Sequence, residues 1–229
     1  MGEYVPQMPA ERVRQLRRWH DEASAELHAL GAHDVDYLGL RLHVPEQVFP
    51  PTPTSDLLGR LVAATVRPGQ RVLDMGCGAG ANAILAALTT DDVVAVDVNP
   101  FAVAATANNA ASNGVAAHVT CVESDLFDAI DGDFDLIVFD PPFRWFAPRD
   151  LLERAFADTN YRTLGRFIVE VGGRLRSGGR VLLFFGTSGD VVHLERLIAQ
   201  AGLTTQTKTE RTIHVRGGDA TYFVRSLTT

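Results

Sequence analysis

The stretch Val72-Leu73-Asp74-Met75-Gly76-Cys77-Gly78-Ala79-Gly80 decides the predicted fold. It begins with a short apolar run, continues with three glycines at alternating positions, and leads into the small apolar residues 81–88. This pattern predicts a buried strand that turns into a helix through glycines. A ligand can approach bare backbone there because no Cβ stands in the way. The N–H groups at the helix start point into the same space, so we expect a nucleotide-type binding turn.

Length and composition indicate a globular protein. A chain of 229 residues can form one large domain, or one domain with an appendage, around a substantial core. No apolar run approaches the roughly 20 residues that a membrane span needs. Residues 1–10 are polar and do not resemble a secretory signal. The two cysteines, Cys77 and Cys121, are too few for a disulfide framework or a zinc site, so we expect a cytoplasmic protein with reduced thiols and no membrane partner.

The net charge of −7 argues against a broad nucleic-acid-binding surface. A local group of arginines, Arg12, Arg14, Arg17 and Arg18, is interpreted as the solvated face of a helix. The seven histidines are scattered without the spacing of metal ligands, so no metal site is expected.

Strands and helices alternate from Arg71 onward. Expected strands are 71–76, 93–98, 118–123, 134–140 and 180–186, and expected helices are 81–88, 100–113, part of 158–176, and 190–201. Alternation of this kind predicts an α/β fold with an open, mostly parallel sheet covered on both faces. The end of the chain differs, because residues 203–215 and 220–227 are two strand-like runs joined by the glycine turn Arg216-Gly217-Gly218-Asp219. That pattern predicts an antiparallel hairpin.

The first part of the chain is expected to form a small cap of helix, hairpin and loop. Residues 9–30 have apolar side chains at three- and four-residue spacing and predict an amphipathic helix. Residues 35–44 alternate and predict a strand or a tight hairpin. Val48-Phe49-Pro50-Pro51-Thr52-Pro53-Thr54-Ser55-Asp56 predicts a stiff extended loop. We therefore divide the chain into a cap, residues 1–55, and a core, residues 56–229, and leave open whether the first helix covers the ligand site.

Carboxylates at the ends of three successive predicted strands indicate which nucleotide binds. Residues 76–81 also satisfy the dinucleotide fingerprint G-x-G-x-x-G/A. Asp74, however, would repel a pyrophosphate, whereas it suits the cationic amino-acid end of S-adenosylmethionine. Asp97 can accept hydrogen bonds from both ribose hydroxyls, and Asp125 can face the exocyclic amine of adenine. These acids line the carboxyl edge of the sheet, where open α/β sheets bind ligands.

Together, residues 72–80, Asp97, Asp125 and the terminal hairpin resemble a class I S-adenosylmethionine-dependent methyltransferase, over about residues 55–229. The resemblance implies a Rossmann-like, seven-stranded, mostly parallel sheet of order 3-2-1-4-5-7-6 with an antiparallel final strand. It also implies S-adenosylmethionine as the cofactor. The cofactor contacts that it implies are Asp74, Gly76, Gly78, Gly80, Asp97, Val98, Asn99, Asp125 and Leu126.

Phe139-Asp140-Pro141-Pro142-Phe143 follows the fourth core strand. It resembles the (Asn/Asp)-Pro-Pro-(Phe/Tyr/Trp) motif of methyltransferases that act on amino and amide nitrogens. The Asp140 side chain and the Pro141 carbonyl can each accept one N–H, Pro142 stiffens the loop, and Phe143 offers a face on which a flat substrate can stack. We expect Asp140, Pro141 and Phe143 to be the catalytic residues, with most of the rate coming from alignment.

The proline-rich loop is similar to that of the release-factor glutamine methyltransferases, and ribosomal-RNA guanine and adenine N-methyltransferases share the general layout. By this resemblance, Thr54 is a candidate cofactor contact and Phe49 a candidate substrate contact. Pro142, Arg144 and Trp145 complete the predicted substrate site. The sequence departs from the family in two ways: Asp140 stands where release-factor and most RNA enzymes carry Asn, and the N-terminal part contains a single clear helix.

The predicted function is S-adenosylmethionine-dependent N-methylation by direct in-line displacement. The acceptor stays open between a protein glutamine, an RNA base and a small amine or guanidine. An ionised Asp140 would favour a cationic acceptor, and the acidic net charge disfavours a large RNA. The alternatives are a NAD(P)-dependent oxidoreductase and a non-catalytic cofactor-binding regulatory protein.

Overall fold

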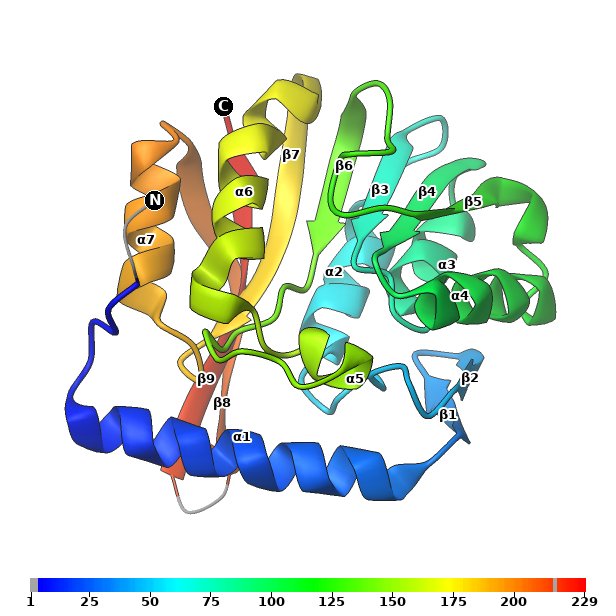
Figure 1. The fold of residues 1–229 in the computed structure, drawn as a ribbon. Helices are drawn as coiled ribbons and strands as arrows, with labels where there is room; N and C mark the ends of the chain where they lie inside the picture. Colours follow the sequence, from blue (N-terminus) through cyan, green and yellow to red (C-terminus); the bar gives the residue numbers. More distant parts are fainter. Residues whose placement is uncertain (1–3, 216–217) are drawn as a thin grey trace.

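A seven-stranded sheet forms the centre of the protein, which a computed structural model describes over residues 4–215 and 218–229 (Figure 1). The sheet order is β5-β4-β3-β6-β7-β9-β8. Its strands are β3 (Arg71–Met75), β4 (Asp92–Asp97), β5 (Val119–Glu123), β6 (Phe134–Phe139), β7 (Leu175–Gly186), β8 (Thr204–Val215) and β9 (Gly218–Thr228). Strands β3 to β7 pair in parallel, and β9 runs antiparallel to both of its neighbours. Counted from β3 as strand 1, the order is 3-2-1-4-5-7-6, which confirms the predicted fold class.

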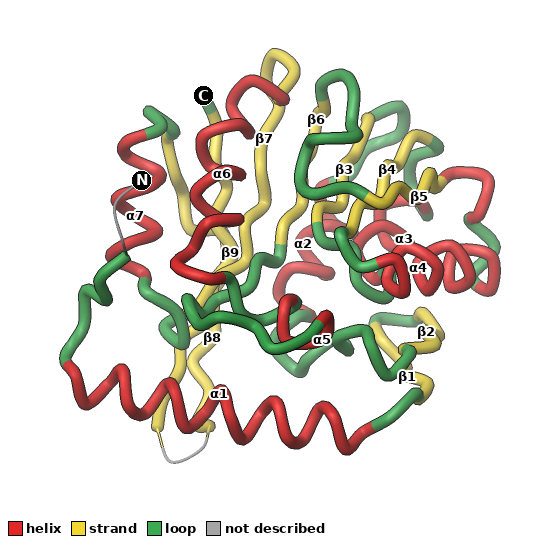
Figure 2. The backbone as a smooth tube through the Cα atoms, in the orientation of Figure 1, coloured by secondary structure: helices red, strands yellow, loops and turns green. Residues whose placement is uncertain are grey.

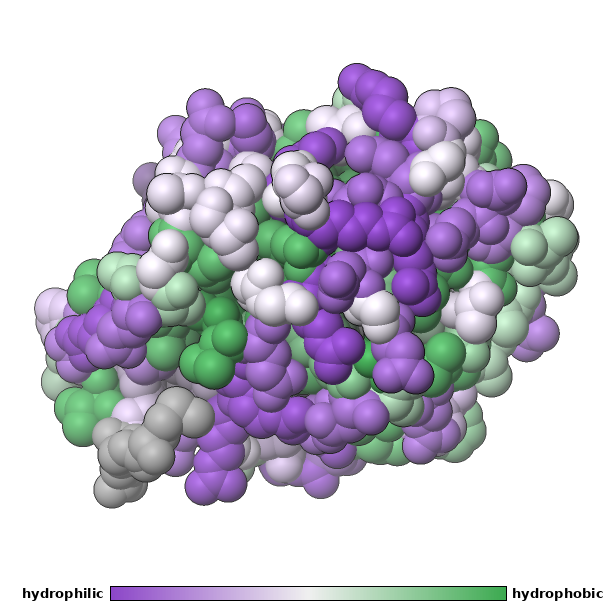
Figure 3. Space-filling model, turned by 90° about the horizontal axis from the view of Figure 1, so that it is seen from above, coloured by the Kyte–Doolittle hydropathy of each residue, from purple (hydrophilic) through white to green (hydrophobic). Residues whose placement is uncertain are grey.

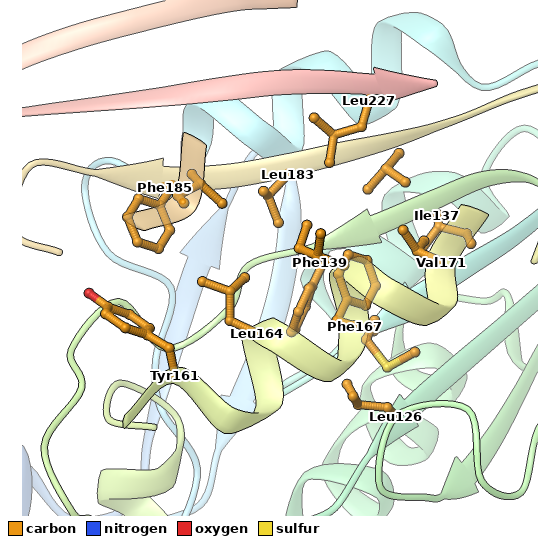
Figure 4. Close-up of a cluster of buried hydrophobic side chains, with 14 of the residues drawn as sticks. Leu126, Ile137, Phe139, Tyr161, Leu164, Phe167, Val171, Leu183, Phe185 and Leu227 are labelled. Carbon is orange, nitrogen blue, oxygen red and sulfur yellow. The ribbon is translucent and has the colours of Figure 1, made fainter. Parts of the chain in front are cut away.

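Helices cover both faces of this sheet (Figures 1 and 2). On one face lie α2 (Asp56–Thr65), α3 (Ala81–Ala87) and α4 (Pro100–Ser112), and on the other lie α6 (Arg162–Val171) and α7 (Val191–Gln200). Figure 4 shows the second of these layers, where Leu164 and Phe167 of α6 pack against Phe139 at the end of β6. The core strands are apolar on both faces, as burial on two sides requires.

The N-terminal cap shares the core of the sheet. Its elements are α1 (Ala10–Leu30) and a hairpin of β1 (His33–Tyr37) and β2 (Leu40–Val44), which confirm the predicted helix and tight hairpin. Helix α1 crosses the carboxyl edge of the parallel strands (Figure 1). Leu16 and Trp19 of α1 belong to the same hydrophobic cluster as α6. The division into residues 1–55 and 56–229 stays a prediction, because side chains from both parts belong to the same hydrophobic clusters.

Helix α6 lies within the predicted segment 158–176, and the Asp158 carboxylate caps its start by accepting from Thr163 N and Leu164 N. One strand differs from its predicted length. Strand β7 starts at Leu175, five residues earlier than predicted, and its pairing with β6 is irregular near that end. Of the predicted hairpin turn, Arg216 and Gly217 lie outside the described residues, whereas the flanking pair Val215 and Gly218 is in register.

The end of the molecule opposite α1 mixes hydrophilic and hydrophobic side chains (Figure 3). None of the helices within residues 4–215 and 218–229 combines the length and the apolar character needed to cross a membrane.

Candidate functional site

A cavity of about 1210 Å³ lies at the carboxyl edge of the parallel strands. Its walls come from the glycine turn after β3, the ends of β4, β5 and β6, the proline-rich loop 48–55, the segment 148–166 and the second half of α1. This is where open α/β sheets place their ligands. Most of the residues predicted to form the site meet here, although they come from segments far apart in the chain.

The glycine turn forms the floor of the cavity. Gly76 and Gly78 have φ values of +70° and +55° and line the cavity. A Cβ at either position would have no protein atom closer than 3.6 Å, so the space above the backbone is open to a ligand. Gly80 differs, because a Cβ there would lie 2.9 Å from Thr106 Cγ2 of α4. The missing side chain of Gly80 therefore allows helix packing, and Gly80 does not line the cavity, so its cofactor contact stays a prediction.

Asp97, at the end of β4, is held by the backbone around it. Its Oδ2 accepts from Gly78 N at 3.0 Å and its Oδ1 accepts from Asn99 N at 2.9 Å. Burial raises the pKa of Asp97, and these hydrogen bonds oppose the rise. Each carboxylate oxygen keeps a further lone pair, so the group can accept from two vicinal hydroxyls. Val98 and Asn99 also line the cavity, and Asn99 ties the proline-rich loop to this edge by donating to Gln47 O.

Asp74 lies behind the glycine turn and outside the cavity wall. Side chains alternate along β3, so Met75 faces the cavity while Asp74 faces α3. Its Oδ2 accepts from Ala83 N at 2.9 Å, which holds the first turn of α3 in place. Burial, together with the charge of Asp97, raises the pKa of Asp74 to about 7. Asp74 thus supports the turn from beneath, and its direct contact with a cationic cofactor group stays a prediction.

Asp125 and Leu126 follow β5 and line the opposite end of the cavity. Asp125 is exposed and forms an ion pair with Arg166, whose guanidinium lies 3.3 Å away and also contacts Asp128 at 2.9 Å. Leu126 is buried, has a φ of +54°, and contributes to the wall of the cavity.

Asp140 lies at the end of β6 and is half-buried in the cavity wall. Burial, reinforced by the nearby charge of Asp74, raises the pKa of Asp140 to about 8. Across residues 4–215 and 218–229, no side chain or backbone group forms a hydrogen bond or an ion pair with this carboxyl group. Pro141, Pro142 and Phe143 continue the same wall. The predicted acceptor site is thus a carboxyl group that has no partner in the described part of the chain.

Phe143 joins the acceptor site to the far strands of the sheet. Its ring centroid lies 5.5 Å from that of Phe184 on β7 and 6.0 Å from that of Tyr222 on β9. The Phe143 carbonyl accepts from the Tyr161 hydroxyl at 2.6 Å, and that hydroxyl accepts from Asp190 N at 2.7 Å. Tyr161 is buried in a left-handed backbone conformation with a φ of +54° (Figure 4). No motif in the sequence signals that Tyr161 holds this loop.

The remaining predicted residues divide into two groups. Phe49, Thr54 and Arg144 line the cavity. Trp145 does not, because it is buried against Phe146 and Tyr4, with ring centroids 4.9 Å and 5.6 Å away. Trp145 therefore packs in the core, and its substrate contact stays a prediction.

Helix α1 covers part of the cavity, a point that the amphipathic pattern alone leaves open. Its second half contributes Ala23, Glu26, Leu27 and Leu30 to the wall. The helix is fastened to α5 (Leu151–Arg154) through buried Glu153, whose carboxylate accepts from Ser24 Oγ at 2.5 Å and from Arg149 N at 2.7 Å.

Arg154 and Arg162, neither of them predicted, line the cavity from the segment that follows the Asp140 loop. Burial raises the pKa of Asp97, and the charge of Arg154 opposes that rise, which places this arginine near the end of β4. Within the described ranges, no group of three or more His, Cys, Asp and Glu side chains is arranged to hold a metal ion.

Comparison with known proteins places the chain among methyltransferases. The family model "Methyltransferase small domain" matches residues 52–209. The ribosomal RNA small subunit methyltransferase C of Chromohalobacter salexigens is 40% identical over 131 residues, which are 57% of this chain and 36% of that protein. A putative protein N5-glutamine methyltransferase of Methanocaldococcus jannaschii is 31% identical over 157 residues, 64% of this chain and 76% of the relative.

Among solved structures, the 16S rRNA N2 G1207 methyltransferase of T. thermophilus, in complex with AdoMet and guanosine, superposes with a TM-score of 0.61 at 25% identity. The superposition covers 86% of this chain and 50% of that one. The chain thus spans about a third of the length of the first relative and half the length of the solved structure.

Proposed function

Because this chain belongs to the methyltransferase small domain family, a class I family whose cofactor is S-adenosylmethionine, we propose that it is an N-methyltransferase acting by direct in-line displacement. The observation that supports the proposal most is the single cavity that joins the glycine turn, Asp97 and the Asp140–Phe143 loop. One end carries features that suit the cofactor, and the other carries a hydrogen-bond acceptor for a substrate nitrogen.

The residues present fit S-adenosylmethionine. Gly76 and Gly78 leave their backbone open to the cavity, in a space that a side chain at either position would occupy. Asp97 is pre-oriented by two backbone N–H groups and can accept from the ribose hydroxyls. Asn99, Leu126 and Thr54 complete the wall at this end. The cofactor, when bound, supplies a methyl group on a positively charged sulfur.

The acceptor end would hold a nitrogen in line with that methyl group. Asp140 is a hydrogen-bond acceptor there, and Pro141 and Pro142 limit the freedom of the loop. Tyr161 restrains the loop further by donating to the Phe143 carbonyl. Alignment of this kind can account for much of the rate of a two-substrate reaction.

The chain's own substrate is a separate question, because its relatives carry names that refer to ribosomal RNA and to protein glutamine. We propose that the partner is a protein, an RNA or a small amine brought to Asp140. We also propose a cytoplasmic location, which suits the free thiols of Cys77 and Cys121. Family membership favours methyl transfer over an oxidoreductase with the same glycine fingerprint.

Calorimetry with adenosylhomocysteine and with NAD⁺ tests the proposal. We expect adenosylhomocysteine to bind and NAD⁺ not to bind. Transfer of tritium from methyl-labelled S-adenosylmethionine would then be screened over a primary amine, a glutamine peptide and guanosine. Binding of NAD⁺ alone, or absence of transfer to every nitrogen tested, would contradict the proposed activity.

A further inference from the structure

We propose that the methyl acceptor is a cationic alkylamine, held in an aromatic cage beside Asp140, and that Asp140 is the base that removes its proton. The inference rests on the N-methyl transfer proposed above and names the class of substrate. It is carried by three features of the acceptor end: the rings around it, the missing counter-charge, and the placement of the cavity's arginines.

Aromatic rings form the acceptor wall. Phe143, Phe184 and Tyr222 all line the cavity. The rings of Phe184 and Tyr222 are stacked, with centroids 5.9 Å apart and planes 14° from parallel, and Phe143 packs against both. Tyr37 lines the same cavity, and burial followed by the charge of Asp140 raises its pKa, so this ring also lies near the carboxyl group. Ring faces attract ammonium groups, most strongly where water is excluded.

No positive side chain of the described chain contacts the Asp140 carboxyl group, although Arg144 follows the same loop and lines the cavity. Asp140 has no ion pair or hydrogen bond within the described part of the chain, whereas Asp56 of α2, outside the cavity wall, is neutralised by Arg60 and Arg211. The titratable groups that face Asp140 are Asp74 from β3 and Tyr37 from β1, and neither supplies a positive charge. A carboxylate beside aromatic rings is therefore best complemented by a positive group on the ligand.

Two of the cavity's arginines lie at the cofactor end, whereas Arg144 follows the acceptor loop itself. Arg166 is bound to Asp125 at the β5 end. Arg154 acts electrostatically on Asp97 at the β4 end. An anionic acceptor would have to bring its charge toward the Asp140 carboxyl group at the site of transfer, which disfavours phosphate-bearing acceptors.

The chemistry explains why an acid stands where related enzymes carry an amide. The nitrogen of a glutamine amide or a nucleobase amine carries no extra proton at neutral pH, so Asn suffices to hold it. An alkylammonium has no lone pair until it loses a proton, and burial gives Asp140 a pKa of about 8, close to what a base needs near neutral pH. Binding of the ammonium would favour the ionised carboxylate.

The reaction balances without a further reactant. The Asp140 carboxylate takes one proton from the ammonium, which leaves a neutral amine and a carboxylic acid. The amine lone pair forms a bond to the methyl carbon while the carbon–sulfur bond breaks, and the electron pair of that bond stays on sulfur. The products are adenosylhomocysteine and a methylated ammonium, and Asp140 returns its proton to water.

Calorimetry on the protein saturated with adenosylhomocysteine tests this inference with two probes, benzylamine, which is cationic at about pH 8, and benzyl alcohol, its neutral analogue. We expect benzylamine to bind at least about tenfold more tightly, the scale of a desolvated cation–π and charge-assisted contact. Asp140→Asn should abolish that preference. Phe184→Leu and Tyr222→Leu should each reduce the preference for benzylamine. Because Tyr222 is only half-buried, Tyr222→Leu tests the cage even if the Phe184 variant fails to fold.

Phe223→Leu is the matched control, because Phe223 is the next residue of β9 but does not line the cavity. Its preference for benzylamine should equal that of the unaltered protein. Equal binding of both probes, or of neither, would overturn the inference, as would full methyl transfer to a neutral glutamine peptide by Asp140→Asn. Failure to bind adenosylhomocysteine would instead contradict the proposed function itself.

Discussion

The two ends of the cavity satisfy their carboxyl groups in different ways. At the cofactor end, Asp97 already accepts from two backbone N–H groups, and Asn99 caps α4 through Phe101 N. At the acceptor end, Asp140 has no partner in the described chain, and burial raises its pKa to about 8. The difference indicates that the first end is pre-organised for a ligand of fixed chemistry, while the second needs a charge or a donor that the ligand brings.

The largest effect is expected where the carboxyl group has no other partner in the described chain. Asp140→Ala should lower turnover at least ~100-fold, the scale of lost alignment and proton transfer. Adenosylhomocysteine affinity should stay nearly unchanged, because Asp140 makes no contact that holds the cofactor end together. Single-turnover methyl transfer and calorimetry measure the two quantities. Asp133→Ala, in the exposed loop before the same strand, is the control, and a fully active Asp140→Ala protein would remove Asp140 from the reaction.

Asp97→Ala should produce the converse result. Loss of hydrogen bonds to a charged group should weaken adenosylhomocysteine binding by roughly 1.5–3 kcal/mol. Part of this loss would come from Gly78 N and Asn99 N, which lose their acceptor. Asp92→Ala is the control, since Asp92 lies at the other end of β4 and is exposed. Equal affinities of Asp97→Ala and the unaltered protein would exclude Asp97 from the cofactor site.

The same contrast explains how much can be predicted from the sequence. The glycine turn, Asp97 and the Asp140 loop are local motifs at strand ends, and parallel pairing brings strand ends together in any sheet of this order. The strand order itself follows from the family resemblance and is confirmed. Motifs at strand ends therefore predict which residues share the cavity.

Side-chain direction and long-range packing cannot be predicted in this way. The position of Asp74 predicts a ligand contact, but the alternation of β3 turns its side chain toward α3. The position of Trp145 after the motif predicts a substrate contact, but its ring packs against Phe146 and Tyr4. Nothing in the sequence indicates the role of Tyr161, because its hydrogen bond to Phe143 joins segments 18 residues apart that show no motif.

The pH dependence of stability sharpens the description of the acceptor end. The folded protein keeps the Asp140 proton up to about pH 8, whereas the unfolded chain releases it near the ordinary pKa of 3.8. The stability linked to this proton is therefore present at low pH and is lost as the pH rises through that interval. An amide cannot ionise, so Asp140→Asn should become the more stable protein as pH rises from about 5.5 to about 8, by at most about 1.4 kcal/mol per pH unit.

Urea unfolding of both proteins across this range measures the difference in the free energy of unfolding. The effect of Asp74, whose pKa is raised for the same reason, is present in both proteins and largely cancels. Two stability curves that run parallel with pH would show that Asp140 ionises normally in the folded state, and the contrast between the two ends of the cavity would then disappear.

The smallest effect is expected at Asp125, which belongs to the cofactor end but is exposed and shared with Arg166. If Asp125 faces the adenine amine, Asp125→Ala should weaken adenosylhomocysteine binding by only about 0.5–1 kcal/mol, the scale of one hydrogen bond near solvent. Asp128→Ala is a matched control, because it also removes an ion-pair partner of Arg166 but does not line the cavity. Equal losses in the two variants would mean that the effect passes through Arg166, whereas a loss confined to Asp125→Ala would place the adenine at the end of β5.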